Sequence, residues 1–401
     1  MPFPFEFVLF GATLLGVALL HRHTLAVAAF GLLLITAYKL MFADFHGIAG
    51  PAGLVEQLAG EWVLLANLFC LLVGFALLSR HFELSQLPQL LPRVLPDDWT
   101  GGLVLLALVF VLSSFLDNIA AAVIGATAAS AVYRQRLHLG FLAALVAAAN
   151  AGGSGSVVGD TTTTMMWLDG VAPLELLRAY VAAVAAFLVF AIPAARQQQK
   201  FSPIVRDPAP GVRIDVSRVI VIALILVGAI VANVYANSLP SDSGDAFPFI
   251  GATVIGLVLL LTPWRRPDWS VVPGAARGAS FLLALVIAAS MMPVDSLPEA
   301  SPRAAFGLGI VSAVFDNIPL TRLALEQGGY DWAALAYAVG FGGSMLWFGS
   351  SAGVAVANLF PEAKSAGQWL RQGWHVAVGY VIGFVVFLLV SGWQPEGPYL
   401  E

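Results

Sequence analysis

The sequence predicts an all-α membrane protein that crosses the bilayer many times and consists of two inverted repeats. Each repeat is expected to hold five transmembrane helices, one of them broken, and one re-entrant helical hairpin. Of the 401 residues, 59% are hydrophobic and only 11% are charged, with a mean hydropathy of +0.86. Soluble domains do not have that balance. Two polar motifs that occur once in each half of the chain indicate the repeat.

The first motif is Asp117-Asn118-Ile119, which returns as Asp316-Asn317-Ile318, each time inside an apolar stretch. The second is a glycine-serine break: Gly152-Gly153-Ser154 with Gly159 after it, and Gly343-Ser344 with Gly349 after it. A carboxylate at membrane depth is costly unless it has a partner, so such residues indicate function. Paired interruptions in two halves are typical of secondary transporters.

The transmembrane elements follow from segment length, because about 20 helical residues cross the hydrocarbon core. Ten segments qualify: 3–20, 24–42, 62–79, 138–168, 174–195, 218–236, 247–263, 277–292, 332–360 and 372–391. Two more apolar stretches, 101–133 and 303–327, contain the Asp-Asn motifs and break near their middles. Their halves are too short to span separately. We therefore expect re-entrant hairpins whose tips are buried by protein or line a polar cavity.

Basic residues predict the orientation, since Lys and Arg accumulate in cytoplasmic loops. With both termini outside, 15 of the 19 basic residues lie inside: Arg22, Arg80, Arg93, Arg134, Arg136, Arg196, Lys200, Arg206, Arg213, Arg218, Arg265, Arg266, Arg277, Lys364 and Arg371. This count requires hairpin 101–133 to open inward and hairpin 303–327 to open outward. The predicted domains are residues 1–196 as the first repeat and 217–401 as the second. A cytoplasmic linker, 197–216, joins them and contains Pro203, Pro208 and Pro210.

The hairpin tips combine carboxylate, amide and hydroxyl oxygens, which suit a small cation. The members are Ser113, Ser114, Asp117 and Asn118 in one tip, and Ser312, Asp316 and Asn317 in the other. Pro319 disfavours helix at the residue before it, so the second tip should break there. The alternative is that each Asp or Asn only caps the second hairpin helix. A serine would cap without placing a charge in lipid, which favours cation or proton chemistry.

The broken spans carry a second set of polar residues. Four glycines between 152 and 159 weaken the first helix by about 1 kcal/mol each relative to alanine. Asn150, Ser154, Asp160 and Thr161–Thr164 crowd that break, whereas Ser344, Ser350 and Ser351 stand in the second. Ser350 occupies the position of Asp160, so the repeat is asymmetric in charge. The alternative is close helix packing through small residues.

Arg322 lies five residues after Asn317 inside an apolar hairpin, where the repeat places Val123. Glu326 is four residues on, the spacing of a helical ion pair. Pairing with Glu326 or snorkelling to the interface is the simpler interpretation. The alternatives are a fixed positive charge that modulates cation binding, or an anion site.

Other kinds of site find little support. A single cysteine, Cys70, in an apolar run forms no internal disulfide. Gly152-Gly153-Ser154-Gly155 with a distant His375 matches intramembrane serine proteases only weakly, and Val157 interrupts the aspartyl-protease pattern before Asp160. Six scattered histidines form no zinc motif. We expect no cofactor and no nucleic-acid partner.

Four segments resemble the ion transporter superfamily, and NhaD-type sodium/proton antiporters most closely: SSFLDNIAAAVIGATAAS, GSVVGDTTTTMMW, SAVFDNIPLTRLALE and GFGGSMLWFGSSAGVAVANLF. That superfamily also includes arsenite-efflux permeases and divalent-anion/sodium symporters. The resemblance implies a scaffold, a mobile transport unit of hairpins and broken helices, and often a homodimer. It also implies ion-site roles for Asp117, Asn118, Asn150, Asp160, Thr161, Thr162, Asp316, Asn317, Ser344, Ser350 and Ser351. Ser154 is a further predicted ion-site residue, because it lies in the first glycine-serine break.

Together these features predict a proton-coupled Na⁺/Li⁺ antiporter in the cytoplasmic (inner) membrane of a prokaryote, with the lipid bilayer and small ions as its partners. Sodium is expected at Asp117, Asp160 and Asp316. A sodium-coupled anion or carboxylate transporter of the same fold is the alternative, with Arg322 holding the anion. An intramembrane protease is a remote third hypothesis.

Overall fold

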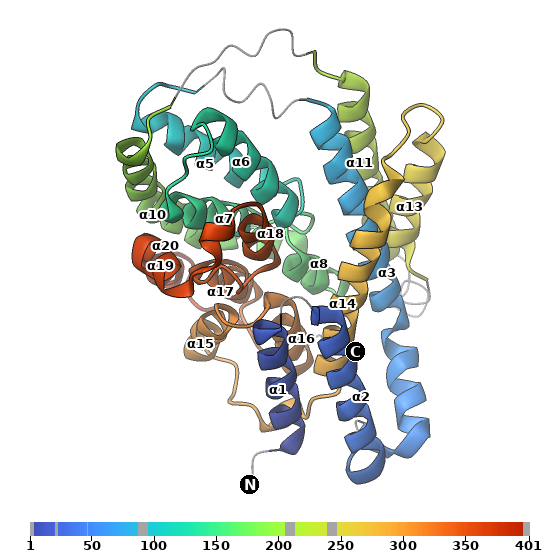
Figure 1. Ribbon diagram of the computed structural model, residues 1–401. Helices are drawn as coiled ribbons and strands as arrows, with labels where there is room; N and C mark the ends of the chain where they lie inside the picture. The colour runs from blue at the N-terminus through green and yellow to red at the C-terminus, as the bar shows by residue number, and fades with distance from the viewer. Residues whose placement is uncertain are drawn as a thin grey trace. The chain divides into compact units, whose positions relative to one another are not determined.

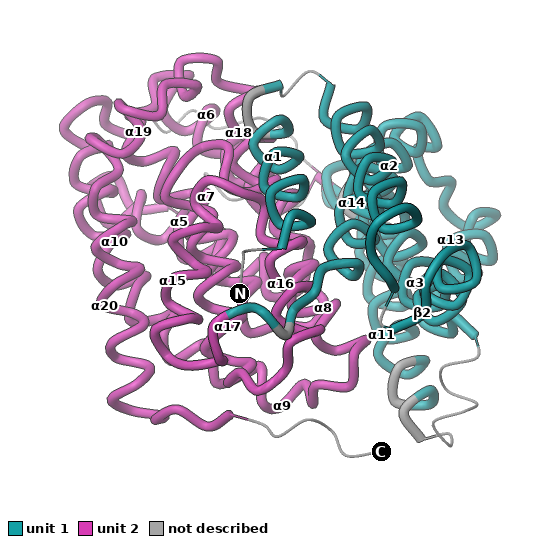
Figure 2. Tube along the Cα trace, turned by 90° about the horizontal axis from the view of Figure 1, so that it is seen from below, with its two compact units in different colours: residues 1–85, 214–297 teal, residues 86–213, 298–401 magenta. Residues whose placement is uncertain are grey.

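The computed structural model describes residues 4–20, 23–45, 47–86, 95–204, 213–238 and 247–395 (Figure 1). These residues form two compact units, shown in separate colours in Figure 2. Unit 1 comprises residues 1–85 and 214–297, and unit 2 comprises 86–213 and 298–401. Each unit therefore takes one segment from each half of the chain. The predicted repeats divide the sequence into halves, which is a different division from these two units. The linker at 197–216 therefore stays a prediction, and residues 205–212 of it lie outside the described ranges.

Unit 1 contains helices and one pair of two-residue strands. Its elements in order are α1 (Phe5–Leu19), α2 (Thr24–Phe42), β1 (Asp44–Phe45), β2 (Ile48–Ala49), α3 (Gly50–Leu84), α11 (Val216–Ser238), α13 (Phe249–Leu261), η3 (Trp269–Val271), α14 (Val272–Ser290) and η4 (Val294–Ser296). β1 and β2 pair antiparallel. Helix α14 packs against α2 and α3, and α13 packs against α3 and α11.

Helix α3 contains the predicted span of 62–79 and extends beyond it, since it begins twelve residues earlier at Gly50. Pro51 favours that start, since a missing N–H costs nothing in the first turn. Gln57 lies on this additional part of the helix, and its Nε2 donates to the Ser290 carbonyl (3.2 Å). Lys39 Nζ donates to the next carbonyl, of Met291 (2.6 Å). Both side chains satisfy carbonyls at the end of α14 that have no partner within that helix.

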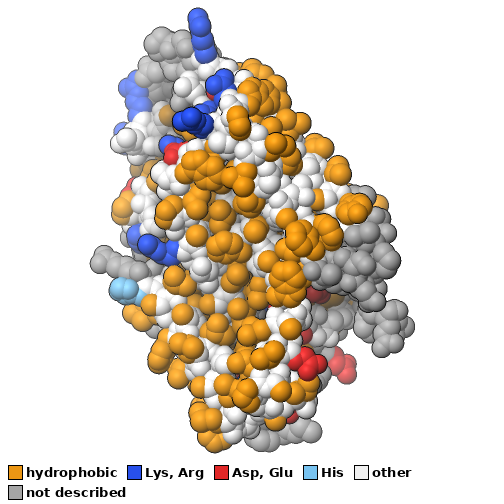
Figure 3. All heavy atoms as spheres, turned by 90° about the vertical axis from the view of Figure 1, so that its right-hand side faces the viewer, with side chains coloured by type: hydrophobic (Ala, Val, Ile, Leu, Met, Phe, Trp, Pro, Cys, Tyr) orange, Lys and Arg blue, Asp and Glu red, His pale blue; other side chains and the backbone are white. Residues whose placement is uncertain are grey.

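On the surface of unit 1, apolar and charged side chains lie in separate regions. Exposed hydrophobic side chains on α11 and α13 include Leu224, Val227, Val231, Leu259 and Leu260. Figure 3 shows a face on which hydrophobic side chains predominate and Lys and Arg gather towards one end. Such a band suits contact with lipid.

Unit 2 holds both hairpins and both broken helices. The hairpins are α5 (Trp99–Ser113) with α6 (Asn118–Val132), and α15 (Pro302–Ser312) with α16 (Asn317–Gln327). The broken helices are α7 (Leu139–Gly153) with α8 (Thr161–Leu168), and α17 (Trp332–Gly342) with η5 (Gly343–Met345) and α18 (Ser351–Leu359). The other elements are α9 (Pro173–Leu176), α10 (Ala179–Phe201), η6 (Pro361–Lys364), α19 (Ala366–Gln372) and α20 (Trp374–Ser391).

The core of unit 2 is centred on α7 and α17, which contact one another and are buried along their whole lengths. Their many Ala and Gly residues allow neighbouring backbones to approach closely. Around them α10 packs against α20, α5 against α7, and α15 against α17. The ring of Tyr337 stacks on Phe341 (5.4 Å) and Tyr380 (6.0 Å), and its hydroxyl donates to the Gly379 carbonyl (3.1 Å). Both halves of the chain thus contribute to one core.

Five described helical segments are long and apolar enough to cross a membrane: Thr24–Phe42, Gly50–Leu84, Pro173–Phe201, Trp269–Ser290 and Trp374–Ser391. Shorter apolar helices include α1, α5, α6, α7, α11 and α13. The protein is therefore a multi-pass membrane protein. Five fewer segments qualify than the ten predicted: the breaks divide two spans into short pieces, and α1, α11 and α13 count among the shorter apolar helices.

Candidate functional site

Each interrupted element of unit 2 resumes at a polar residue that caps the next helix. The Asp117 carboxylate accepts from the Ile119 N–H (3.2 Å), and Asp316 accepts from the Ile318 N–H (3.1 Å). Asp160 caps α8, and Ser350 accepts from the Gly353 N–H (3.2 Å) at the start of α18. Capping, the simpler interpretation of the sequence, therefore does occur. It leaves oxygens of these side chains available for other partners.

Asp160 shows such additional partners. Its Oδ2 accepts from the Thr162 hydroxyl (2.7 Å), and its Oδ1 accepts from the Asn118 amide (3.1 Å). The same amide of Asn118 donates to Asn150 Oδ1 (3.1 Å). Asp160, Asn118 and Thr162 are all buried. The tip of the first hairpin and the first broken helix therefore share one hydrogen-bonded polar network.

Asn150 extends that network to the second broken helix. Its Nδ2 donates to the hydroxyls of Ser344 (2.9 Å) and Ser350 (3.0 Å). Asn150 is completely buried, and its side chain hydrogen-bonds to three other predicted site residues, Asn118, Ser344 and Ser350. This side chain therefore links α6, α7, η5 and the start of α18.

The second hairpin contributes Asp316, whose Oδ2 accepts from the Ser351 hydroxyl (3.1 Å). Asn317 is buried at the start of α16, and its carbonyl accepts from the Thr321 hydroxyl (3.0 Å). Thr161 is buried at the start of α8. Ser154 donates to the carbonyl of Ala151 in its own helix (2.8 Å), so its hydroxyl closes the end of α7.

Glycines bring the hairpins against the breaks. A Cβ on Gly152 would collide with the Phe110 carbonyl, and one on Gly342 would collide with the Gly309 carbonyl. Threonines hold the first break in shape, since the hydroxyls of Thr163 and Thr164 donate to the carbonyls of Ser156 (2.6 Å) and Val157 (2.8 Å) within it. The packing role of the small residues, one of the two sequence interpretations, is therefore present alongside the polar network.

The carboxylates do not share one point, since Asp160 accepts from Asn118 and Thr162, whereas Asp316 accepts from Ser351. Within the described residues, no three His, Cys, Asp or Glu side chains converge as a metal-binding group. A cation here would be held by a carboxylate together with amide, hydroxyl and backbone oxygens, which are hard ligands suited to a small hard cation.

Gly340 belongs to the site but is absent from the sequence-based set. A Cβ at this position would lie 2.9 Å from Asp160 Oδ2, so the missing side chain makes room for the carboxylate. The motif offset that aligns Gly153 with Gly343 also aligns Asn150 with Gly340. Because Asn150 is a predicted site residue, its alignment with Gly340 is the sequence signal that could have identified this glycine.

Arg322 forms the predicted ion pair with Glu326. It also pairs with Asp169, the residue that ends α8 (3.4 Å), a partner that sequence spacing does not indicate. The residues considered for a protease site or a disulfide have partners or states of a different kind. The Ser154 hydroxyl bonds to Ala151, His375 contacts Gln197 (3.3 Å), and Cys70 is a free thiol.

Known proteins with similar sequences are antiporters. Sodium/proton antiporter 1 of Arabidopsis thaliana is 25% identical over 335 residues, which are 75% of this chain and 56% of that protein. The Na(+)/H(+) antiporter NhaD of Vibrio cholerae is 23% identical over 331 residues, 71% of this chain and 69% of the relative. NhaD of Halomonas elongata is 33% identical over 88 residues, 21% of this chain and 18% of the relative. No family model matches the chain.

These relatives confirm the resemblance to NhaD-type antiporters that the motifs predict. Each is named as a transporter rather than an enzyme, in agreement with the sequence-based expectation. The matched region covers little more than half of the Arabidopsis protein's length.

Proposed function

We propose that this protein is a secondary active transporter that exchanges Na⁺ or Li⁺ for protons. One observation supports this most strongly. Asp160 lies buried at a helix break, hydrogen-bonded to Asn118 and Thr162, in a chain whose relatives are named sodium/proton antiporters. The network provides oxygen ligands for a cation, together with one titratable group, the Asp160 carboxylate.

Exchange requires a carboxylate that binds either a proton or a cation. Burial favours the protonated form of a carboxylic acid, and a nearby cation favours the ionised form. The two ligands then compete for the same oxygens. Asp160 is the first candidate for this role and Asp117 the second, with Asp316 contributing from the other half. Hydroxyl, amide and carbonyl oxygens replace part of the hydration shell of the ion.

The test is reconstitution into proteoliposomes that enclose a pH-sensitive dye. Addition of Na⁺ should move protons across the membrane, and Li⁺ should do the same. Sodium-dependent uptake of an anion without proton movement would instead support the anion symporter. The pairing of Arg322 with Asp169 and Glu326 argues against that alternative, because two carboxylates already neutralise the guanidinium.

The proposed architecture is a pair of inverted repeats with re-entrant hairpins at 101–133 and 303–327. Cysteines that replace Asp97 and Arg134, one on each side of the first hairpin in the sequence, should label from the same side of the membrane, in a background where Cys70 is replaced by serine. Labelling from opposite sides would mean that the first hairpin crosses the bilayer. The inner membrane of a prokaryote, termini on the outer side, and a homodimer belong to the same proposal.

A further inference from the structure

We propose that Arg322 is a positioning residue that couples α8 to α16 through Asp169 and so sets the placement of Asp160 relative to Asp316. This inference depends on the proposed function, since Asp160 and Asp316 matter here as parts of the ion site. It assigns Arg322 neither to the ion nor to an anion.

The geometry of α8 is the first argument. This helix has eight residues and is therefore about 12 Å long. Asp160 caps its beginning, and Asp169 ends it. The hydroxyls of Thr163 and Thr164 fasten its first turn to the Asp160 carbonyl. A short helix moves as one piece, so a force on Asp169 reaches Asp160.

The second argument is the placement of Arg322 on α16. Asp316 caps this helix and Arg322 follows six residues later. The Arg322 side chain is 8% exposed, and an enclosed guanidinium requires ionic partners. Glu326 on the same helix holds one terminal nitrogen, while the other reaches Asp169 on α8. The ion pair therefore joins two helices that contact one another and each begin at a carboxylate of the site.

The third argument is the contrast with the corresponding helix junction at the first hairpin. There α6 packs against α18, as α16 packs against α8. By the offsets of the two motifs, Arg322 corresponds to Val123 and Asp169 to Leu359. A charged pair at one helix junction thus corresponds to two apolar residues at the other. General helix packing does not require that charge, which indicates a specific task at the α8–α16 junction.

The experiment measures Na⁺-evoked proton movement in proteoliposomes for Arg322→Gln, Asp169→Asn and the double variant. We expect each single change to raise the Na⁺ concentration at half-maximal rate at least about fivefold. The double variant should be no worse than either single variant, because both remove the same coupling. Arg322→Lys should restore part of the affinity.

Two controls separate coupling from other roles. Glu326→Gln removes the partner on the same helix and should change half-saturation less than Asp169→Asn does. Arg178→Gln with Asp331→Asn removes another ion pair of unit 2 (3.0 Å) and should lower thermal stability without changing half-saturation. If Arg322→Gln misfolds, Asp169→Asn decides alone, since Asp169 is partly exposed.

Three results would overturn the inference. The first is a lowered melting temperature with unchanged half-saturation, which would make the pair merely structural. The second is additive effects of the two single changes. The third is equal effects of Glu326→Gln and Asp169→Asn, which would indicate a local charge effect. Failure of the proposed function itself is distinguishable, because the unmodified protein would then show no Na⁺-evoked proton movement.

Discussion

Substitution of Gly340 by alanine should separate transport from stability. Gly340 lies within α17, where alanine stabilises a helix by about 1 kcal/mol relative to glycine. The new Cβ would lie 2.9 Å from Asp160 Oδ2, whereas ordinary van der Waals contacts begin at 3.4 Å. The carboxylate must therefore shift by about 0.5 Å, since it is the flexible partner. The fold should tolerate this change better than the ion site does.

The expected loss of Na⁺ affinity follows from the strength of the hydrogen bond that the shift of Asp160 would weaken. Thr162 donates to the same oxygen of Asp160 at 2.7 Å. A hydrogen bond to a charged group is worth about 1.5–3 kcal/mol, so losing half of it corresponds to roughly a three- to tenfold change in affinity. We expect the Na⁺ concentration at half-maximal rate to rise by that factor.

The assay compares Gly340→Ala with Gly307→Ala in proteoliposomes and in thermal unfolding. Gly307 lies within α15, and a Cβ there would meet nothing within 4 Å. Both variants should melt at or above the temperature of the unmodified protein, and only Gly340→Ala should lose Na⁺ affinity. Unchanged half-saturation in a folded Gly340→Ala variant would refute the role of the Asp160 carboxylate in binding the cation.

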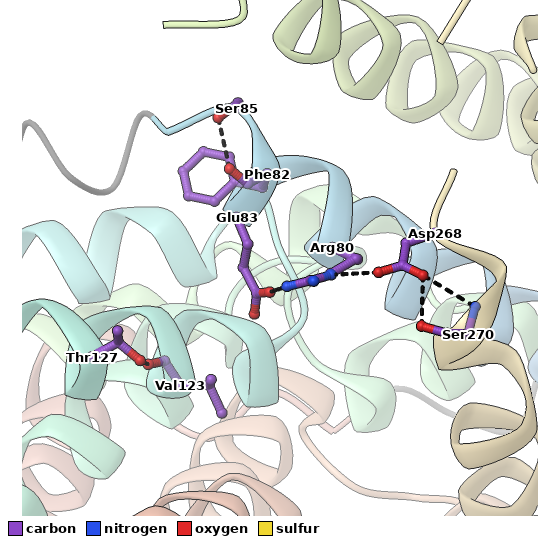
Figure 4. Close-up of polar contacts among 8 residues, drawn as sticks. All are labelled: Arg80, Phe82, Glu83, Ser85, Val123, Thr127, Asp268 and Ser270. Atoms are coloured by element: carbon purple, nitrogen blue, oxygen red, sulfur yellow. Dashed lines mark hydrogen bonds and ion pairs between the residues drawn. The ribbon is translucent and has the colours of Figure 1, made fainter. Parts of the chain in front are cut away.

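Three other substitutions follow from the same structure. Asp160→Asn should abolish Na⁺-evoked proton movement yet fold, because the amide oxygen can still cap α8; near-normal exchange would leave Asp160 only a cap. Asn150→Ala should lower the free energy of unfolding by about 1–3 kcal/mol, as it removes the amide that joins both broken helices, and an unchanged melting temperature would contradict this. Asp268, in a loop outside the membrane-spanning segments, accepts from the Ser270 hydroxyl (2.5 Å) and from Arg80 (2.9 Å), which lowers its pKa to about 2 (Figure 4). A lowered carboxyl pKa stabilises the fold above the ordinary value of 3.8, so the advantage over Asp268→Asn in thermal unfolding should disappear as the pH falls from 3.8 towards 2. A constant advantage across that range would argue against the ionised carboxylate.

Much of the local architecture could be predicted from the sequence. The helix breaks follow from Gly and Ser runs and from the Asp-Asn motifs, since backbone preferences and capping act over a few residues. The stretches 101–133 and 303–327 each contain two helices, α5 and α6 or α15 and α16, with the predicted break between them. The extension of α3 twelve residues before the predicted span was not predicted, and Gln57 in that extension bonds to Ser290 at the far end of α14.

The sequence by itself determined the membrane class, the places where helices break, and the polar residues at each break. Those properties depend on composition and on neighbours along the chain. Only the tertiary structure decided which of these residues meet. Asn150 reaches Ser344 and Ser350 across about two hundred positions, Gly340 leaves room for Asp160, and Arg322 finds Asp169 on another helix. Such contacts depend on how buried helices pack, and one chain without its fold carries no signal for packing partners so distant in sequence.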